Sequence, residues 1–567
     1  MKHRSLLVLF IGLMAALSMA VVADVVWAAT NSVGKELPMD AAPPEKQVFY
    51  KLSGPATTLD WFISVYNRPG QVNDLFSVPL VQLNKNFEIL PAAATSWEAS
   101  ADGLTWTFHL DRNLVWTDGN AVTADDYVFS FQLGADPKHA WDFAWFYSPI
   151  KNWDKAVKGE VPVSQIGVRK GRDDYTLLVT TENPAPYLPS MMLYSTPLSK
   201  RAYDRYGEFY NNRPETSVSS GPFILQEWTK DKQIVLVANK KYGGKVKPYL
   251  EKMVVIFGDP KNEFTSYQAN EVDIAETFSP ADIELISRDP DLNTQYHQGF
   301  GDFRTHYLGF DTYRPPFNNL KVRQAISHVI DRDSLIKNVV KRQGMAAYSF
   351  LMPGFPDSNV EGLKGIQNFD PALGKRLLAE AGYPDGRGFP KIELWLRNES
   401  SLGQAIGNAM AAMIKQHLGI EVTVTNKEGK LFMDTLNAHN LQFYMVSYGM
   451  DYLDASNMLG IWVSTGRHAW KNDRFDKLVD DAASLVGDMA KRSAMFKEAE
   501  KILVEDVAGV FLWHVTPGTM WKPYVKGSEL EADKNGMVAW HWPGIEGIGQ
   551  LHLTTYISRD VDRYRRK

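Results

Sequence analysis

The sequence predicts an α/β fold built from more than one domain. Short apolar runs with the period-two alternation of strands stand between longer stretches with helical spacing, and this alternation is typical of layered α/β proteins. The chain has 567 residues, of which 44% are hydrophobic and 22% are charged. That composition is ordinary for a globular protein, and the length exceeds what one small core needs, so we expect roughly two or three domains.

The clearest local pattern lies between residues 94 and 131. Alternating apolar residues after the Asp102-Gly103 turn predict a half-buried strand, and Asp118-Gly119 predicts the next turn. Thr123 and Asp126 form a capping-box pair, which predicts the start of a helix. The alternating strand residues are Leu104, Trp106, Phe108 and Leu110, and the helix would bury Tyr127, Val128 and Phe131.

Other elements are predicted by the same rules. A Pro-rich polar stretch at 35–46 indicates a flexible N-terminal arm. Apolar spacing at 322–340 predicts one helix, with Lys321, Arg323 and Asp331 off its buried face. A second helix is predicted between Asp370 and Gly382. Further strands are expected at 48–50, 234–237, 253–257 and 392–396.

Residues 1–29 have the organisation of a cleaved signal peptide. Two basic residues precede an apolar run at 6–23, and the small residues Ala28 and Ala29 suit a signal peptidase. The run is just long enough to span a membrane, so an uncleaved anchor is the alternative. The chain has no Cys, which excludes both disulfides and a lipid-bearing Cys after the signal. We therefore expect an exported, soluble protein without a lipid anchor.

Charge and motif content exclude several functions. A formal net charge of -5 provides no excess of positive charge of the kind that binds nucleic acid. The sequence contains no nucleophile elbow, zinc-protease motif or Walker loop, and its 12 His residues lack metal-ligand spacing. Gly544, Gly547 and Gly549 have no strand-turn-helix context, which favours a loop over a nucleotide cradle. We predict no catalytic residue, no metal site and no cofactor.

Several short motifs, taken in order, resemble those of one known family. They are Asp74-Leu75-Phe76, Ser220-Gly221-Pro222-Phe223 with Trp228, Glu271-Val272-Asp273-Ile274, the segment 316–336, Ala379 to Pro384, and Asp451-Tyr452. Together with residues 94–131 they resemble the extracellular solute-binding protein family five, the peptide-binding branch of the proteins that feed bacterial ABC importers. The resemblance spans nearly the whole chain.

The resemblance implies a two-lobed periplasmic-binding-protein fold whose lobes close on a hinge. The first lobe is expected to be discontinuous, built from residues 30–75, 197–305 and 516–567, with an inserted domain at 76–196. The second lobe is expected at 306–515. The hinge segments are predicted near 306–311 and 513–518.

The resemblance also places a ligand site around Asp451. Peptide binders of this family pair an Asp, followed by Tyr, with the α-ammonium of the ligand, and Asp451-Tyr452 matches that motif. Tyr448, Gly449 and Met450 precede it, and Tyr448 supplies an aromatic face where relatives have Trp. The alternative interpretation is a turn-forming Asp in a loop.

Three departures from the family pattern concern the carboxylate of the ligand. Oligopeptide binders carry an Arg at the position of Met445 and a His at the position of Gly403, and both help to hold the carboxylate of a peptide. A ligand-facing Trp falls on Gly429. The ligand could therefore be a longer peptide, a peptide held by another basic residue, or an uncharged oligosaccharide.

Aromatic residues bear on that choice because sugar rings stack on aromatic faces. Trp462 follows the Asp motif and is the candidate for such a face, whereas Trp141 to Trp153 are expected to form core. We predict a monomeric, periplasmic, peptide-binding subunit of an ABC importer that works with membrane permease subunits. An oligosaccharide-binding protein is the alternative. A secreted hydrolase, with Asp451 and Asp454 as its acids, is the less favoured third class.

Overall fold

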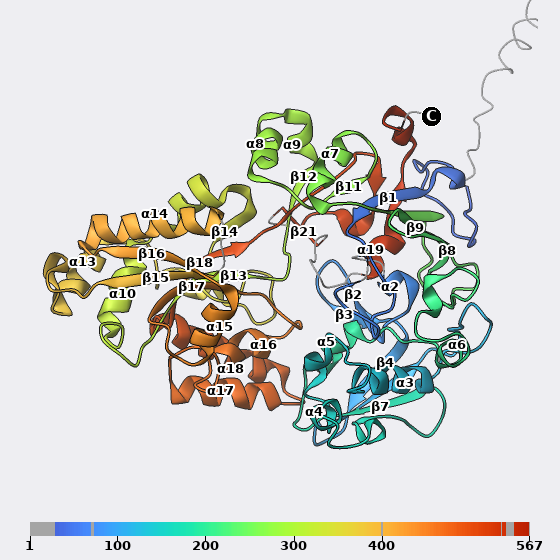
Figure 1. Cartoon of the computed structure of the whole chain (residues 1–567), viewed down its shortest axis with the longest axis horizontal. Helices are drawn as coiled ribbons and strands as arrows, with labels where there is room; N and C mark the ends of the chain where they lie inside the picture. The colour runs from blue at the N-terminus through green and yellow to red at the C-terminus, as the bar shows by residue number, and fades with distance from the viewer. Residues whose placement is uncertain are drawn as a thin grey trace, which may run out of the picture.

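The computed structural model describes residues 29–67, 69, 73–397, 401–533, 536–539 and 549–565. All but the last residue of the predicted signal peptide lies outside this described part, as do Gly544 and Gly547. The chain forms two lobes joined by short segments, with helices and sheets in each (Figure 1). The predicted two-lobed α/β fold is confirmed.

The first lobe collects strands from distant parts of the sequence. In one sheet β1 pairs in parallel with β10, and β9 and β8 follow antiparallel. In the other sheet the order is β11-β19-β12-β21. These strands are β1 (Val48–Ser53), β8 (Phe223–Thr229), β9 (Gln233–Ala238), β10 (Lys252–Phe257), β11 (Ile274–Ala275), β12 (Tyr296–Gly299), β19 (Gly518–Trp521) and β21 (Met537–Val538). The lobe is therefore discontinuous, as predicted.

The inserted domain is built on a third sheet of order β4-β5-β7-β6. The predicted strand is β5, and the predicted capping box of Thr123 and Asp126 begins α3, which buries Tyr127 and Phe131. Asp126 accepts a hydrogen bond from the backbone N–H of Thr123 at 3.0 Å. The elements are β4 (Ala94–Ala99), β5 (Thr105–Leu110), α3 (Ala124–Gly134), β6 (Val168–Lys170) and β7 (Thr176–Thr180).

The aromatic residues between 141 and 153 form core, as expected. Trp141 stacks at 6.1 Å on Tyr147, and Trp153 is fully buried beside Phe131. Trp145 is the exception, with 52% of its surface exposed. This cluster packs the inserted domain and leaves little aromatic surface for a ligand.

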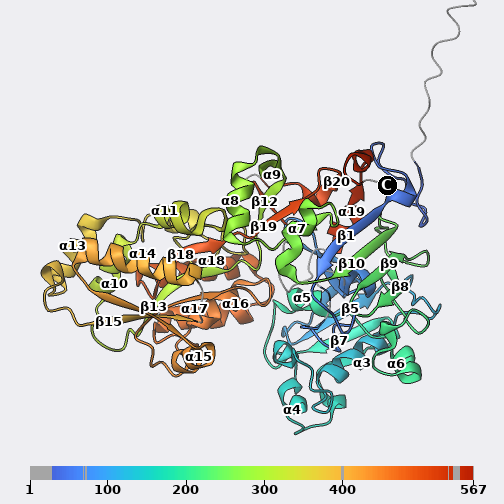
Figure 2. The same ribbon diagram turned by 45° about the horizontal axis from the view of Figure 1, so that its top comes forward.

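The second lobe has a six-stranded sheet of order β14-β18-β13-β17-β15-β16 with helices on both faces. Helices α10, α13 and α14 cover one face, and α15 to α18 lie on the other (Figure 2). The strands are β13 (Thr305–Phe310), β14 (Gly344–Ala346), β15 (Ile392–Arg397), β16 (Val422–Lys427), β17 (Phe443–Tyr448) and β18 (Gly509–Val515). The helices are α10 (Leu320–Val329), α13 (Pro371–Glu380), α14 (Ser401–Leu418), α15 (Gly429–Asn437), α16 (Ala455–Leu459), α17 (Asp473–Ser484) and α18 (Met489–Glu505).

The predicted helix at 322–340 is divided in two. Helix α10 ends before Ile330, and Asp331 then caps the short helix α11 (Arg332–Leu335) by accepting a hydrogen bond from the Ser334 N–H. An Asp side chain bonds readily to nearby backbone N–H groups, which favours a new helix start over continuation. The single continuous helix was therefore wrong.

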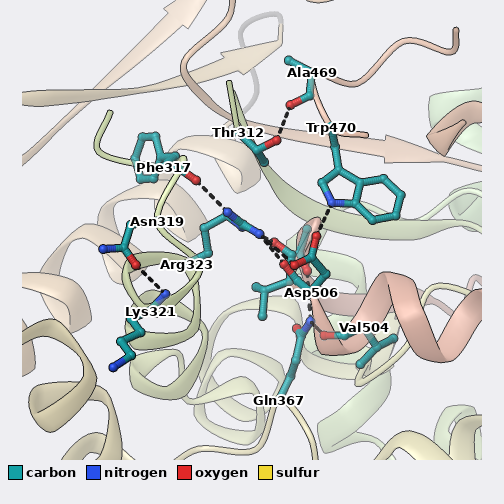
Figure 3. Close-up of polar contacts among 12 residues, drawn as sticks. Thr312, Phe317, Asn319, Lys321, Arg323, Gln367, Ala469, Trp470, Val504 and Asp506 are labelled. Carbon is teal, nitrogen blue, oxygen red and sulfur yellow. Dashed lines mark hydrogen bonds and ion pairs between the residues drawn. The ribbon is translucent and has the colours of Figure 1, made fainter. Parts of the chain in front are cut away.

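Arg323 was expected to stay off the buried face, yet only 4% of its surface is exposed. Its guanidinium donates to the carbonyls of Phe317 at 2.8 Å, Val507 at 3.1 Å and Asp506 at 2.7 Å (Figure 3). The Asp506 carboxylate also accepts a hydrogen bond from the Trp470 indole at 2.5 Å. Burial is tolerated because the donors of Arg323 are paired with acceptors.

The N-terminal arm is not free of the first lobe. Leu37 and Ala42 are buried, and the Asn31 amide donates to the carbonyl of Pro248 at 2.8 Å. The ammonium of Lys35 lies 3.5 Å from the ring centre of Tyr249. Pro-rich composition indicated flexibility, but the apolar side chains among the polar ones anchor the arm.

Two short segments connect the lobes. Residues 300–304 lead from β12 to β13, and Thr516 and Pro517 lead from β18 back to β19. The Gly299 N–H donates to the Pro517 carbonyl at 2.8 Å, and the Val515 N–H donates to the Arg304 carbonyl at 2.8 Å, so the two segments run side by side. The first connection thus precedes the predicted 306–311, which lies almost entirely in β13.

Candidate ligand-binding site

The loop at 449–454 lies where the two lobes meet. It follows β17, whose last residue Tyr448 pairs with Thr305, the first residue after the connecting segment. The Met450 N–H donates to the Asp302 carbonyl at 2.9 Å. A Cβ at Gly449 would lie 2.1 Å from the Asp302 carboxylate, so a larger residue at this position would displace the Asp302 side chain.

Asp451 is half-buried in this loop, and its carboxylate is held on one side. Its Oδ2 accepts hydrogen bonds from the Tyr448 hydroxyl at 2.6 Å and the Asn457 amide at 3.2 Å. The backbone N–H of Asp451 donates to Asn457 Oδ1 at 2.8 Å. Within the described residues Oδ1 has no hydrogen bond, and no Lys, Arg or His lies within ion-pair distance of this carboxylate. The group is thus oriented and still able to accept a cation.

Tyr448 supports this carboxylate from the core side. Burial raises the pKa of the Tyr448 phenol, and the nearby charge of Asp451 adds to this effect. The phenol therefore stays neutral and can donate its hydrogen bond. The guanidinium of Arg467 lies 5.0 Å from the centre of its ring. One face of the Tyr448 ring is therefore occupied by Arg467.

Tyr452, on the same loop, contacts the inserted domain. Its ring stacks on Tyr187 of the inserted domain, with ring centres 4.9 Å apart and planes inclined by 20°. Phe146 of the same domain lies edge-on at 6.5 Å. Tyr452 therefore joins the second lobe to the inserted domain, a contact that no sequence pattern indicated.

A cavity of about 620 Å³ lies between the lobes, and its lining includes Met445, Val446 and Ser447 of β17 but none of residues 448–454. Met445 and Gly403, the two positions where relatives carry carboxylate-binding side chains, both line it. The first lobe contributes Glu276, Thr277, Phe278, Pro517 and Gly518. The second lobe contributes His306, Val340, Gln343, Leu396, Arg397, Leu402, Gly403, Ile406, Met445, Val446, Ser447, Trp513 and Val515.

His306 and Trp513 are lining residues that the sequence analysis missed as ligand candidates. Their rings stack with centres 4.0 Å apart and planes inclined by 9°. Burial lowers the pKa of His306 to about 3, so its imidazole is neutral. His306 fell within the predicted hinge, and only the register of β13 against β17 and β18 places it opposite Ser447 and Trp513.

Trp462 and Gly429 lie away from this cavity wall. Trp462 is fully buried, and its indole stacks on His468 at 4.0 Å inside the second lobe. It therefore offers no exposed face to a ligand, because nearness in sequence to Asp451 did not reflect the direction of its side chain. Gly429 is the first residue of α15, directly after its cap Glu428.

Asp454, considered above as the second acid of a hydrolase, has a structural role in a buried ion pair. Its carboxylate receives two hydrogen bonds from Arg492, at 2.7 and 2.9 Å, and both residues are largely buried. It also caps α16 by accepting a hydrogen bond from the Ser456 N–H at 2.9 Å. An acid paired in this way is poorly placed to exchange protons with a substrate.

In the part of the chain that the structure describes, no three His, Cys, Asp or Glu side chains gather as a metal ion would require. None of the helices in that part combines the length and the apolar character needed to cross a membrane.

Two lobes, paired connecting segments and a cavity between them define the class of solute-binding proteins. The chain belongs to the bacterial extracellular solute-binding proteins, family 5, whose sequence model matches residues 88–470. It is 30% identical over 460 residues to the periplasmic oligopeptide-binding protein OppA of Salmonella typhimurium, covering 77% of this chain and 81% of the relative. It is 29% identical to the probable deoxycholate-binding periplasmic protein YgiS of Escherichia coli, covering 87% and 93%.

Solved structures indicate which arrangement of the lobes is present. The unliganded open form of the murein tripeptide-binding protein MppA superposes with a TM-score of 0.79, at 28% identity, covering 92% of this chain and 99% of that one. Another structure of Escherichia coli MppA gives a TM-score of 0.62 over similar coverage. The arrangement of the lobes in this chain is therefore more similar to that unliganded open form than to the second structure.

Proposed function

We propose that this protein is the peptide-capturing subunit of an ABC importer. In this proposal the chain is exported through its N-terminal signal, is released as an unanchored monomer in the periplasm, and delivers its ligand to membrane permease subunits. The names of its relatives, which include oligopeptide- and murein peptide-binding proteins, support the peptide class. They also support the periplasmic location.

The observation that carries the proposal is the carboxylate of Asp451. It is fixed on one side by Tyr448 and Asn457 and has an oxygen available on the other. An incoming α-ammonium would form a charge-assisted hydrogen bond there, which contributes about 1.5–3 kcal/mol when sheltered from water. Because Asp451 lies at the junction of the lobes, closure would provide that shelter.

The two alternatives have less support. An oligosaccharide ligand needs exposed aromatic faces, but Trp462 is buried and the Tyr452 ring is stacked on Tyr187. A hydrolase needs a second free acid near Asp451, and Asp454 is paired with Arg492. The relatives named above are binding proteins, which agrees with a chain that is not an enzyme.

The test is the affinity of Asp451→Ala and Asp451→Asn for short peptides, measured by isothermal titration calorimetry. We expect each variant to bind a peptide with a free amino terminus at least about tenfold more weakly, a loss of about 1.4 kcal/mol. The same peptide with an acetylated amino terminus should bind wild type and variants alike. Asp473→Ala is a matched control, because the side chain of Asp473 is 85% exposed in the same lobe. Unchanged affinity for the free-amine peptide would remove Asp451 from the site.

A further inference from the structure

The part of the interlobe cavity lining that the second lobe contributes is largely apolar. Leu396, Ile406 and Met445 are nearly inaccessible to solvent, with 2%, 0% and 7% of their surfaces exposed. Leu396 and Met445 are paired neighbours on β15 and β17, and Ile406 comes from α14 above them. Trp513 and Val340 extend this wall, and Phe278 faces it from the first lobe. A volume of about 620 Å³ is within the range of small-molecule sites.

Positive charge on the described lining is limited to one exposed side chain. Among the described lining residues only His306 and Arg397 are basic. His306 is neutral because burial against Trp513 lowers its pKa to about 3. Arg397 is exposed at the last position of β15.

One further cation contacts the lining and is already paired. Arg304 forms an ion pair with Asp302 at 2.5 Å and donates to the hydroxyl of the lining residue Ser447 at 3.2 Å. A carboxylate buried against Leu396, Ile406 and Met445 would lose its hydration, whereas the charged basic side chain on the described lining, Arg397, is exposed at the end of β15. That burial is unfavourable, whereas an apolar group would gain free energy there.

We propose that the ligand places a bulky apolar group, such as a large aliphatic or aromatic side chain, in this cavity, and that its carboxylate is held away from the apolar wall at Met445. This deepens the proposed function and rests on it for the peptide class. Gly403 adds to the room, because it has no side chain at a position on the same wall. Phe278 and Pro517 of the first lobe would cover the apolar group as the lobes close, so that the group favours the closed form.

The first experiment compares tripeptides by calorimetry. Phe-Ala-Ala, Ala-Phe-Ala and Ala-Ala-Phe are each measured against the same peptide with Ser in place of Phe. We expect at least one Phe peptide to bind about tenfold or more tightly than its Ser counterpart, as full burial of an aromatic side chain allows. Equal affinities for every Phe and Ser pair would overturn the inference while leaving peptide capture intact.

Variants of Met445 locate the effect in this cavity. Met445→Arg should abolish the preference for Phe and should make the protein favour free-acid over amidated peptides at least tenfold. Met445→Gln, which has similar volume and no charge, should reduce the preference for Phe while the protein remains folded by circular dichroism. Met489→Arg adds the same charge at a side chain that is 59% exposed in the same lobe, so it should behave like wild type. A preference for Phe that survives Met445→Arg contradicts the proposal.

A second readout does not depend on peptide binding. The fluorescent apolar probe 1-anilinonaphthalene-8-sulfonate should bind the wild type with a defined stoichiometry, and Met445→Gln should weaken this binding at least fivefold, whereas Met489→Gln should not. If no peptide binds but the probe behaves in this way, peptide capture fails and the apolar site stands. Probe binding that is indifferent to Met445 overturns the site.

Discussion

The buried ion pair of Asp454 and Arg492 should be essential for the stability of the second lobe. Arg492 is 3% exposed and Asp454 is 11% exposed, and two hydrogen bonds of 2.7 and 2.9 Å join them. Arg492 also donates from Nε to the Ala482 carbonyl at 2.9 Å. Arg492→Met would leave the Asp454 carboxylate buried without a cation. Removing one partner of a buried ion pair costs about 3–5 kcal/mol, and we expect a loss of this size in the free energy of unfolding.

Urea unfolding followed by circular dichroism measures this loss. Asp454→Asn combined with Arg492→Met should be more stable than Arg492→Met alone, because the double variant buries no unpaired charge. Lys491→Met is the matched control, since it removes a neighbouring cation whose side chain makes no ion pair among the described residues. A loss below about 1 kcal/mol in Arg492→Met, or no recovery in the double variant, would refute the argument.

Two further predictions concern buried acids. Burial raises the pKa of Glu500 from 4.5 to about 7, so its stabilising contribution is complete below about pH 4.5 and is lost as the pH rises to 7. Glu500→Gln should therefore gain stability relative to wild type as the pH rises from 5 to 8, by roughly 3 kcal/mol at most. Chemical denaturation at several pH values measures this gain, and a difference that does not depend on pH would contradict the prediction. In the first lobe, Arg565 pairs with the buried Asp273, which also accepts a hydrogen bond from the Tyr524 hydroxyl at 2.6 Å. Arg565→Met should lower the melting temperature and cost about 2 kcal/mol or more, whereas the exposed Arg563→Met should cost little, and equal effects of the two would contradict the argument.

The elements that the sequence predicted well depend on local chemistry. The strand β5 and the capped start of α3 are determined by alternation and by a side chain that reaches a backbone N–H three residues away. The helix α13 begins at the predicted cap Asp370, which accepts a hydrogen bond from the Leu373 N–H at 2.9 Å. Such signals lie within one turn of chain, so a single sequence contains them fully.

The errors concern side chains whose surroundings come from distant segments. Arg323 is buried because it donates to the carbonyl of Val507, a residue 184 positions away. Trp462 is buried because its neighbours in space include Tyr307 and Phe511 from two other strands. No local pattern distinguishes such a Trp from one that faces a ligand. The cavity wall has the same origin, since Leu396, Met445 and Trp513 meet only through the order of the strands.

The position of the Asp451 loop links ligand capture to the arrangement of the lobes. Met450 is bonded to Asp302 in the connecting segment, and Tyr452 is stacked on Tyr187 of the inserted domain. A ligand held by Asp451 therefore contacts a loop that touches both the connecting segment and the inserted domain. A ligand shifts the equilibrium between the open and closed forms only to the extent that its affinities for the two forms differ. An α-ammonium at Asp451 and an apolar group beside Met445 both gain from the exclusion of water, so each would favour the closed form, and a ligand that carries both groups would favour it more strongly than either alone.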